Sequence, residues 1–109
     1  MNMSQQIGTT LTRLQRFDSE KAGDLKATIQ LILIGHEGGK FVLHINEGQI
    51  KVGRGQAHSP DLALTMASED FLAIMRGEAD PMKMIITGQI GVEGDRLLAM
   101  RLKSILLDD

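Results

Sequence analysis

Residues 60–106 decide the fold, and their sequence is PDLALTMASEDFLAIMRGEADPMKMIITGQIGVEGDRLLAMRLKSIL. The first segment, residues 62–66, alternates large apolar residues with Ala and Thr, which predicts a strand. Ser68 then precedes two acids and an apolar patch, and Gly77 follows that patch. A serine N-cap, acids in the first turn and a glycine beyond the end are typical of a short helix, so we expect one here with Ser68 as its cap.

A second short helix is expected directly after the first. Asp80-Pro81 opens it, because proline is favoured at the first helical position, and Gly88 closes it. Its expected inner face holds three residues: Met82, Ile85 and Ile86. Residues 89–93 then alternate through Ile and Val, which predicts a further strand.

The last helix is expected to start at a cap formed by Gly94-Asp95 and to run to about Leu107. One wide apolar stripe on it consists of Leu98, Ala99, Leu102, Ile105 and Leu106. Three further apolar residues fall on the other side, among Arg96, Arg101, Lys103 and Ser104: Leu97, Met100 and Leu107. The helix is therefore more apolar than one sheet face requires. Either these three side chains pack against neighbouring loops or a partner chain, or some of them line an opening into the interior. The basic residues beside them fit either a solvated face or contact with an anionic membrane.

The sequence before Pro60 predicts one helix and three strands. A buried helical stripe recurs within residues 4–17: Ile7, Leu11 and Leu14. The period then changes to two in three short segments separated by glycine-containing turns: residues 28–34, 41–46 and 50–52. Two successive hairpins predict an antiparallel meander. The fold class is therefore α+β, with one five-stranded, mostly antiparallel sheet, helices on one face and the other face largely exposed to solvent.

Length and composition restrict the kind of protein. A chain of 109 residues has room for one core, so we expect residues 1–109 to form a single domain. No apolar run approaches the roughly 20 residues of a transmembrane helix, and the first residues lack the pattern of a secretory signal. The sequence contains no cysteine, which fits a reducing compartment, and we expect a cytoplasmic protein. The net charge of −2 argues against nucleic acid as a partner.

Aromatic residues are few and methionines are many. The chain has 3 Phe and 7 Met, with no Trp or Tyr. A core of flexible aliphatic side chains can repack around irregular contents. An ordinary aliphatic core with a few surface methionines explains the same composition, so both interpretations stay open.

The sequence offers no convincing catalytic or metal-binding constellation. His36, His44 and His58 lie in a turn, a strand and a loop, without partners at helical spacing, so neither a metal site nor a cofactor is expected. His44 is expected on the exposed side of its strand. If the protein were an enzyme, Glu93 or Asp95 would be the candidates for its acid–base group.

The order of these elements resembles the sterol carrier protein-2 family. The likeness is carried by a series of motifs: Ser68-Glu69-Asp70-Phe71, Gly77 with Asp80-Pro81, Gly88-Gln89-Ile90, Val92-Glu93-Gly94-Asp95 and Ala99-Met100-Arg101-Leu102. The elements upstream also fit, so the resemblance extends over residues 4–107. Proteins of that family have a five-stranded sheet covered on one side by helices, with a hydrophobic tunnel between the two layers. The resemblance implies such a tunnel here.

The resemblance also implies which residues line the tunnel. The matching positions are Ile29, Leu31, Leu33, Phe71, Ile74, Met75, Met82, Ile85, Ile86, Met100, Leu102 and Ile105. Two departures concern the ligand: Met84-Ile85-Ile86 stands where the family often has a phenylalanine, and Gln89 and Gly91 stand where it often has lysines. The chain ends Leu107-Asp108-Asp109, without a peroxisomal tripeptide, so a small stand-alone, bacterial and cytoplasmic member is expected.

The function that the resemblance implies is non-enzymatic binding or transfer of an intracellular lipid, such as a fatty acid, an acyl-CoA or a sterol-like ligand. The expected partners are that ligand and, transiently, a membrane surface. We expect a monomer, with a weak dimer as the alternative. A second hypothesis is an interaction module that docks a partner enzyme or self-associates through the last helix, and a third is an enzyme that acts on a lipid-like substrate.

An empty binding slot would be costly for so small a domain. A slot of about 300 Å³ would forfeit about 7 kcal/mol, which is comparable to the whole stability of a small domain. We therefore expect the chain either to hold a ligand or to be partly collapsed without one.

Overall fold

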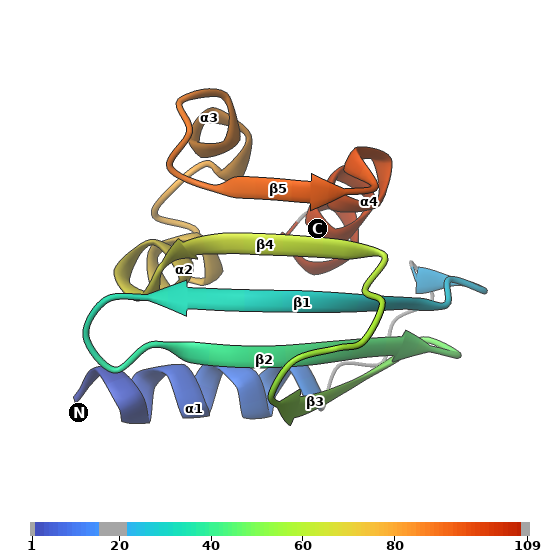
Figure 1. Cartoon of the computed structure of the whole chain (residues 1–109), viewed down its shortest axis with the longest axis horizontal. Coiled ribbons are helices and arrows are strands. Elements are labelled where there is room, and N and C mark those ends of the chain that lie inside the picture. The colour runs from blue at the N-terminus through green and yellow to red at the C-terminus, as the bar shows by residue number, and fades with distance from the viewer. Residues whose placement is uncertain (1, 16–21, 108–109) are drawn as a thin grey trace.

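The computed structural model of the chain describes residues 2–15 and 22–107. Its elements in chain order are α1 (Met3–Gln15), β1 (Ala27–Ile34), β2 (Gly39–Asn46), β3 (Gln49–Arg54), β4 (Leu62–Ala67), α2 (Ser68–Met75), α3 (Pro81–Ile86), β5 (Gly91–Gly94) and α4 (Arg96–Leu107) (Figure 1). The expected order of helices and strands is confirmed, and the part of the predicted first helix beyond Gln15 lies outside the described residues.

The strands form one sheet in the order β3-β2-β1-β4-β5. The pairs β1·β2, β2·β3 and β4·β5 are antiparallel, as in the predicted meander, whereas the central pair β1·β4 is parallel. The predicted α+β class with a mostly antiparallel sheet is therefore confirmed. Because β3 lies at one edge and β4 lies beside β1, the chain between them must cross a face of the sheet (Figure 1).

This crossover, residues 55–61, covers part of the sheet face that was expected from the sequence to be exposed. Gln30 points from β1 to this face and is only 3% exposed. Its Nε2 donates to the carbonyl oxygen of Gly55 at 2.9 Å, and its Oε1 accepts from the backbone N–H of Ala57 at 2.6 Å. The expectation of a largely solvent-exposed second face is therefore wrong at its centre, because the parallel pairing of β1 and β4 brings the crossover over it.

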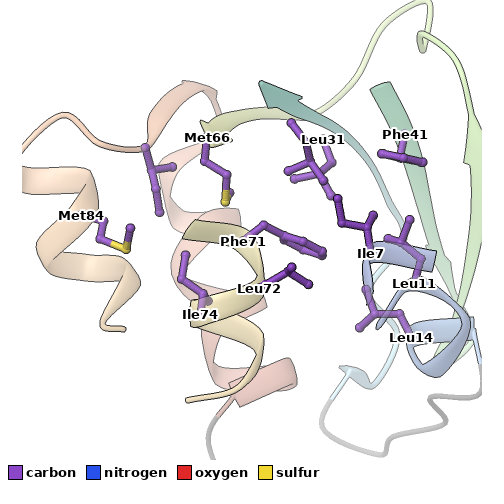
Figure 2. Close-up of a cluster of buried hydrophobic side chains, with 12 residues drawn as sticks. Ile7, Leu11, Leu14, Leu31, Phe41, Met66, Phe71, Leu72, Ile74 and Met84 are labelled. Atoms are coloured by element: carbon purple, nitrogen blue, oxygen red, sulfur yellow. The ribbon is translucent and has the colours of Figure 1, made fainter. Parts of the chain in front are cut away.

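The helices cover the other face in two groups. α1 lies against β3 and α2, whereas α4 lies against β4 and β5 (Figure 1). The predicted α1 stripe is buried and consists of Ile7, Leu11 and Leu14. Figure 2 shows Phe71 of α2 pointing toward Ile7 and Leu31, so α1, α2 and β1 share one cluster of buried side chains.

One of the two predicted N-terminal helix caps, that at Asp95, is confirmed, and Asp80 caps the helix that Asp80-Pro81 was expected to open. Asp80 accepts from the backbone N–H of Met82 at 2.9 Å and Asp95 accepts from that of Leu98 at 3.1 Å, and these bonds start α3 and α4. The predicted Ser68 cap is wrong, because Ala67 occupies the N-cap position and makes no side-chain cap bond. Ser68 is instead a buried helical residue whose hydroxyl donates to the carbonyl oxygen of Ile34 at 3.5 Å.

The predicted inner face of α3 is also corrected. Met84 is the buried residue of this helix, while Ile86 is 81% exposed. Residues two apart on a helix point about 200° away from each other, so burying Met84 turns Ile86 to solvent. Met84 packs in the same buried cluster as Ile90, whose backbone N–H donates to the carbonyl oxygen of Met84 at 3.0 Å.

Candidate functional site

An apolar pocket of about 100 Å³ lies between the sheet and the helices. From the sheet it is lined by Ile29, Leu31, Leu43, Leu64 and Met66. Around the helical side it is lined by Leu14, Phe71, Ile74, Met75, Pro81, Ile90, Ala99, Leu102, Lys103, Leu106 and Leu107. The walls are thus hydrocarbon from seven different elements, with a single lysine among the described residues that form them.

The pocket lies where two groups of core residues meet. One group joins α1 and α2 to the sheet, and Figure 2 shows its side chains. The other joins α4 to the sheet through Leu98 and Leu102. Leu64 and Leu106 pack against both groups and line the pocket between them. The sheet side of the pocket follows from the alternation of side chains along a strand, because every second residue of β1 and β4 points to the helices.

Half of the predicted tunnel residues line this pocket. They are Ile29, Leu31, Phe71, Ile74, Met75 and Leu102. Leu33 and Ile105 are buried but lie elsewhere in the core. The structure thus brings together the predicted residues of β1, α2 and the centre of α4.

The other four predicted residues do not line the pocket. Met82 and Ile85 are half-buried on α3, and Ile86 is exposed. Met100 is 53% exposed. It lies two positions from each of the buried Leu98 and Leu102, so helical geometry turns it away from the sheet. Met100 and Ile86 are therefore corrected from pocket-facing to surface positions.

Several residues that line the pocket were not among the predicted tunnel residues, although the sequence pattern indicated an inward position for most of them. Leu64 and Met66 alternate with smaller residues in β4, and Leu43 does the same in β2, so strand periodicity would have found them. For Leu107 the sequence left open whether it packs against neighbouring loops or a partner chain or lines an opening into the interior. In the structure it lines the pocket. Lys103 had no such signal, because a charged residue beside two arginines predicts a solvated position.

The pocket opens beside two surface clefts. The first lies between α1 and α2 and shares Leu14 and Met75 with the pocket. The second lies between the α2–α3 connection and α4 and shares with the pocket Ile74, Met75, Pro81, Lys103, Leu106 and Leu107. The entrance is therefore at the C-terminal ends of α2 and α4, with Lys103 on its rim.

The residues named for an enzyme lie away from the pocket. Asp95 caps α4, and Glu93 is exposed on β5. His44 is exposed on β2, as expected, with Nδ1 3.4 Å from the hydroxyl of Thr28. Across residues 2–15 and 22–107, no group of three His, Cys, Asp or Glu side chains is arranged to hold a metal ion. Within these ranges no helix combines the length and apolarity needed to cross a membrane.

The fold and the pocket define a class of protein, namely a small α+β domain that offers an apolar site between a sheet and its covering helices. The sequence matches the SCP-2 sterol transfer family over residues 9–107, and the chain belongs to this family. It therefore falls in a group of domains that bind or transfer lipids.

Relatives and solved structures agree with this assignment. The chain is 32% identical over 78 residues to hydroxysteroid dehydrogenase-like protein 2 of Xenopus tropicalis and 30% identical over 101 residues to that of Xenopus laevis. These matches cover 71% and 89% of this chain but only 19% and 24% of the frog proteins. The solution structure of palmitated SCP2L2 from Aedes aegypti is similar with a TM-score of 0.77 and 25% identity, and covers 98% of this chain and 96% of that one.

Proposed function

We propose that residues 1–109 act as one non-enzymatic lipid-binding domain, which takes up the acyl chain or ring system of a fatty acid, an acyl-CoA or a sterol-like ligand in the pocket. The observation that carries this proposal is the pocket itself, whose walls are hydrocarbon except for Lys103. Such walls offer chiefly desolvation of an apolar ligand, which supports binding and transfer as the proposed function. A cytoplasmic location is part of the proposal and fits a cysteine-free sequence.

The driving force of this binding is the removal of hydrocarbon from water. Each buried methylene contributes about 0.8 kcal/mol, so a medium-length chain offsets several kcal/mol of association cost. The pocket has few polar groups that could fix a ligand's orientation, which favours broad rather than strict selectivity among apolar tails.

The size of the pocket makes a widening step part of the proposal. Its volume is about 100 Å³, whereas pockets for small molecules typically measure about 300–1,000 Å³. At about 24 cal/mol per Å³, the void costs about 2 kcal/mol, which a small domain tolerates. Met75, Leu106 and Leu107 at the entrance are only partly buried, and methionine adapts its shape easily. We propose that these side chains move apart as a ligand enters.

The side of α4 that faces away from the sheet fits transient contact with an anionic membrane. Leu97 is 78% exposed and Met100 is 53% exposed. Arg96 and Arg101 are exposed next to them, and α4 contains no acidic residue. Apolar side chains flanked by cations are suited to an anionic lipid surface. We propose that the protein exchanges its ligand there as a monomer.

The same exposed residues support a second candidate function, an accessory module that docks a partner enzyme or a second copy of itself. This candidate is favoured by the frog relatives, of which the matching region makes up less than a quarter. Unlike the lipid-binding and transfer function proposed above, which we call the carrier proposal, this function needs no ligand in the pocket.

The carrier proposal is tested by thermal unfolding of the delipidated chain with and without palmitic acid. A ligand at 100 times its Kd stabilises the folded state by about 2.7 kcal/mol, so Tm should rise by about 10 °C. An unchanged Tm at saturating palmitic acid would contradict the proposal.

A further inference from the structure

The chain contains 7 Met, and one of them, Met75, lies where the apolar pocket meets both surface clefts. Met75 is the last residue of α2, and it lines the pocket together with Phe71 and Ile74 of the same helix. It also lines the cleft between α1 and α2 and the cleft between the α2–α3 connection and α4. Met75 is half-buried. It therefore borders the space for a ligand on one side and solvent on the other.

The other described methionines do not combine these two properties. Met66 lines the pocket, but it is only 5% exposed and belongs to neither cleft. Met100 is 53% exposed, but it does not line the pocket. Three more line neither the pocket nor the two clefts: Met3, Met82 and Met84. Among the methionines that the structure describes, Met75 is thus the one that forms the pocket wall and also meets solvent.

Both clefts are wide enough to bring small solutes to Met75. Their volumes are about 470 Å³ and 450 Å³, and polar side chains such as Thr10, Arg13 and Asp80 line them. Hydrogen peroxide is little larger than water, so it can enter wherever water enters. Because oxidation of a side-chain sulfur depends on solvent access, we expect peroxide to reach Met75 and to be kept from the buried Met66.

Oxidation would change the pocket wall at this point from apolar to polar. The sulfur of Met75 attacks one oxygen of hydrogen peroxide, the O–O bond breaks and an S–O bond forms. The other oxygen takes both protons and leaves as water, so the sulfur is oxidised and the peroxide is reduced. The product, methionine sulfoxide, is polar and accepts hydrogen bonds. An apolar ligand that covers this oxygen removes its water without offering a donor, which disfavours binding.

We propose that Met75 is a modification site, at which oxidation to methionine sulfoxide by hydrogen peroxide closes the pocket to apolar ligands. The inference rests on the proposed function, since it needs a ligand that enters the pocket. It goes beyond that function because it makes occupancy of the pocket depend on an oxidant. Met75 is one of the side chains that the carrier proposal moves apart on entry, so a polar group there acts at the entrance.

The first measurement tests the site itself. The wild-type chain is treated with dilute hydrogen peroxide, and tandem mass spectrometry of its peptides follows the oxygen gained by each methionine over time. We expect Met75 and Met100 to be oxidised at least about fivefold faster than Met66 and Met84. If Met100 is oxidised while Met75 reacts as slowly as Met66, the assignment of the site is wrong.

The second measurement tests the effect on the pocket. Calorimetry gives the affinity for decanoic acid before and after a treatment that is stopped before Met66 reacts. The wild type should lose affinity about tenfold. Met75→Leu, which has no sulfur at this position, should change by less than about twofold on treatment. Met100→Leu is the matched control, because it removes the more exposed sulfur outside the pocket, and it should lose affinity on treatment like the wild type.

A pair of variants repeats the comparison without an oxidant. Met75→Gln places a side-chain oxygen in the pocket wall and should weaken decanoic acid about tenfold. Met100→Gln makes the same change outside the pocket and should bind decanoic acid like the wild type. Unweakened binding in Met75→Gln would contradict the claim that a polar group at this position closes the pocket.

The remaining outcomes separate this inference from the carrier proposal. If oxidised Met75 leaves the affinity unchanged, or if the wild type and Met75→Leu lose affinity alike, the inference is wrong while the carrier proposal stands. Global unfolding of the treated wild type in a thermal scan would also overturn it, because the closure would not be local. If the untreated chain binds no decanoic acid, the carrier proposal fails and this inference fails with it.

Discussion

The backbone N–H of Ala57 donates a hydrogen bond of 2.6 Å to Oε1 of Gln30, and this bond ties the crossover between β3 and β4 to the centre of the sheet. Nε2 of the same side chain donates to the carbonyl oxygens of Phe41 at 3.1 Å and of Gly55 at 2.9 Å. A single buried amide thus satisfies three backbone groups. It lies on the face opposite the pocket, so it supports the fold without touching the site.

Replacement of Gln30 by leucine should therefore destabilise the protein and leave the ligand site intact. Loss of the three bonds leaves buried or half-buried backbone groups without partners, and we expect a loss of about 2–4 kcal/mol in unfolding free energy. Urea denaturation measures it. Gln49→Leu is the control, because Gln49 is exposed on β3 and should change stability by less than about 0.5 kcal/mol. Equal stability of the two variants would contradict the role given to Gln30.

Gly94 ends β5 in a conformation that other residues avoid. Its φ is +107°, and a Cβ there would lie 2.6 Å from the carbonyl oxygen of Asp61. Gly94→Ala should cost more than about 2 kcal/mol in unfolding free energy. Gly53→Ala should cost far less, because a Cβ at Gly53 meets nothing within 4 Å. Similar denaturation midpoints for the two variants would contradict the close approach of β5 and the start of β4.

Most of the fold was predictable because its signals are local. The helical spacing of Ile7, Leu11 and Leu14 and the caps at Asp80 and Asp95 are each contained within one or two turns. The parallel pairing of β1 and β4 had no such signal, since it joins segments more than thirty residues apart through the crossover that buries Gln30. That pairing brings the crossover over the sheet face that the helices leave open.

The residues of the pocket were predictable only in part. Ile29, Leu31, Phe71 and Ile74, which the family resemblance named, line the pocket. α3 has only six residues, fewer than two turns, so its sequence could not show which side faces inward, and Ile86 was assigned wrongly. The role of Lys103 in the wall appears only when α4 is placed against the α2–α3 connection.

Ala99 offers a way to fill the pocket without touching its charged rim. It is a small, half-buried lining residue on α4. Ala99→Leu should lower the affinity for decanoic acid at least tenfold, because the added side chain occupies the space for the tail, while Tm stays equal or rises as the void is filled. Calorimetry and thermal unfolding measure the two effects. Ser104→Leu, on the exposed side of the same helix, should leave affinity unchanged. Undiminished affinity in Ala99→Leu would place the ligand elsewhere.

Met100 separates the carrier proposal from the docking alternative. Because its side chain lies outside the pocket, Met100→Asp should keep the affinity for decanoic acid within about twofold while reducing binding to vesicles that contain phosphatidylglycerol. Ser104→Asp, with the same change of charge on the same helix, should reduce vesicle binding less. Loss of a larger species in sedimentation velocity, with uptake of the fatty acid intact, would favour docking of a second copy. Loss of fatty-acid uptake in Met100→Asp would contradict the position of the pocket.

Native mass spectrometry of the gently purified chain tests the central claim most directly, since it weighs the protein together with whatever it holds. The account predicts either a one-to-one adduct of lipid mass from the cell or, after delipidation, a one-to-one complex with added palmitic acid that Ala99→Leu fails to form. A chain that shows only its own mass of 11.9 kDa in both preparations would contradict it.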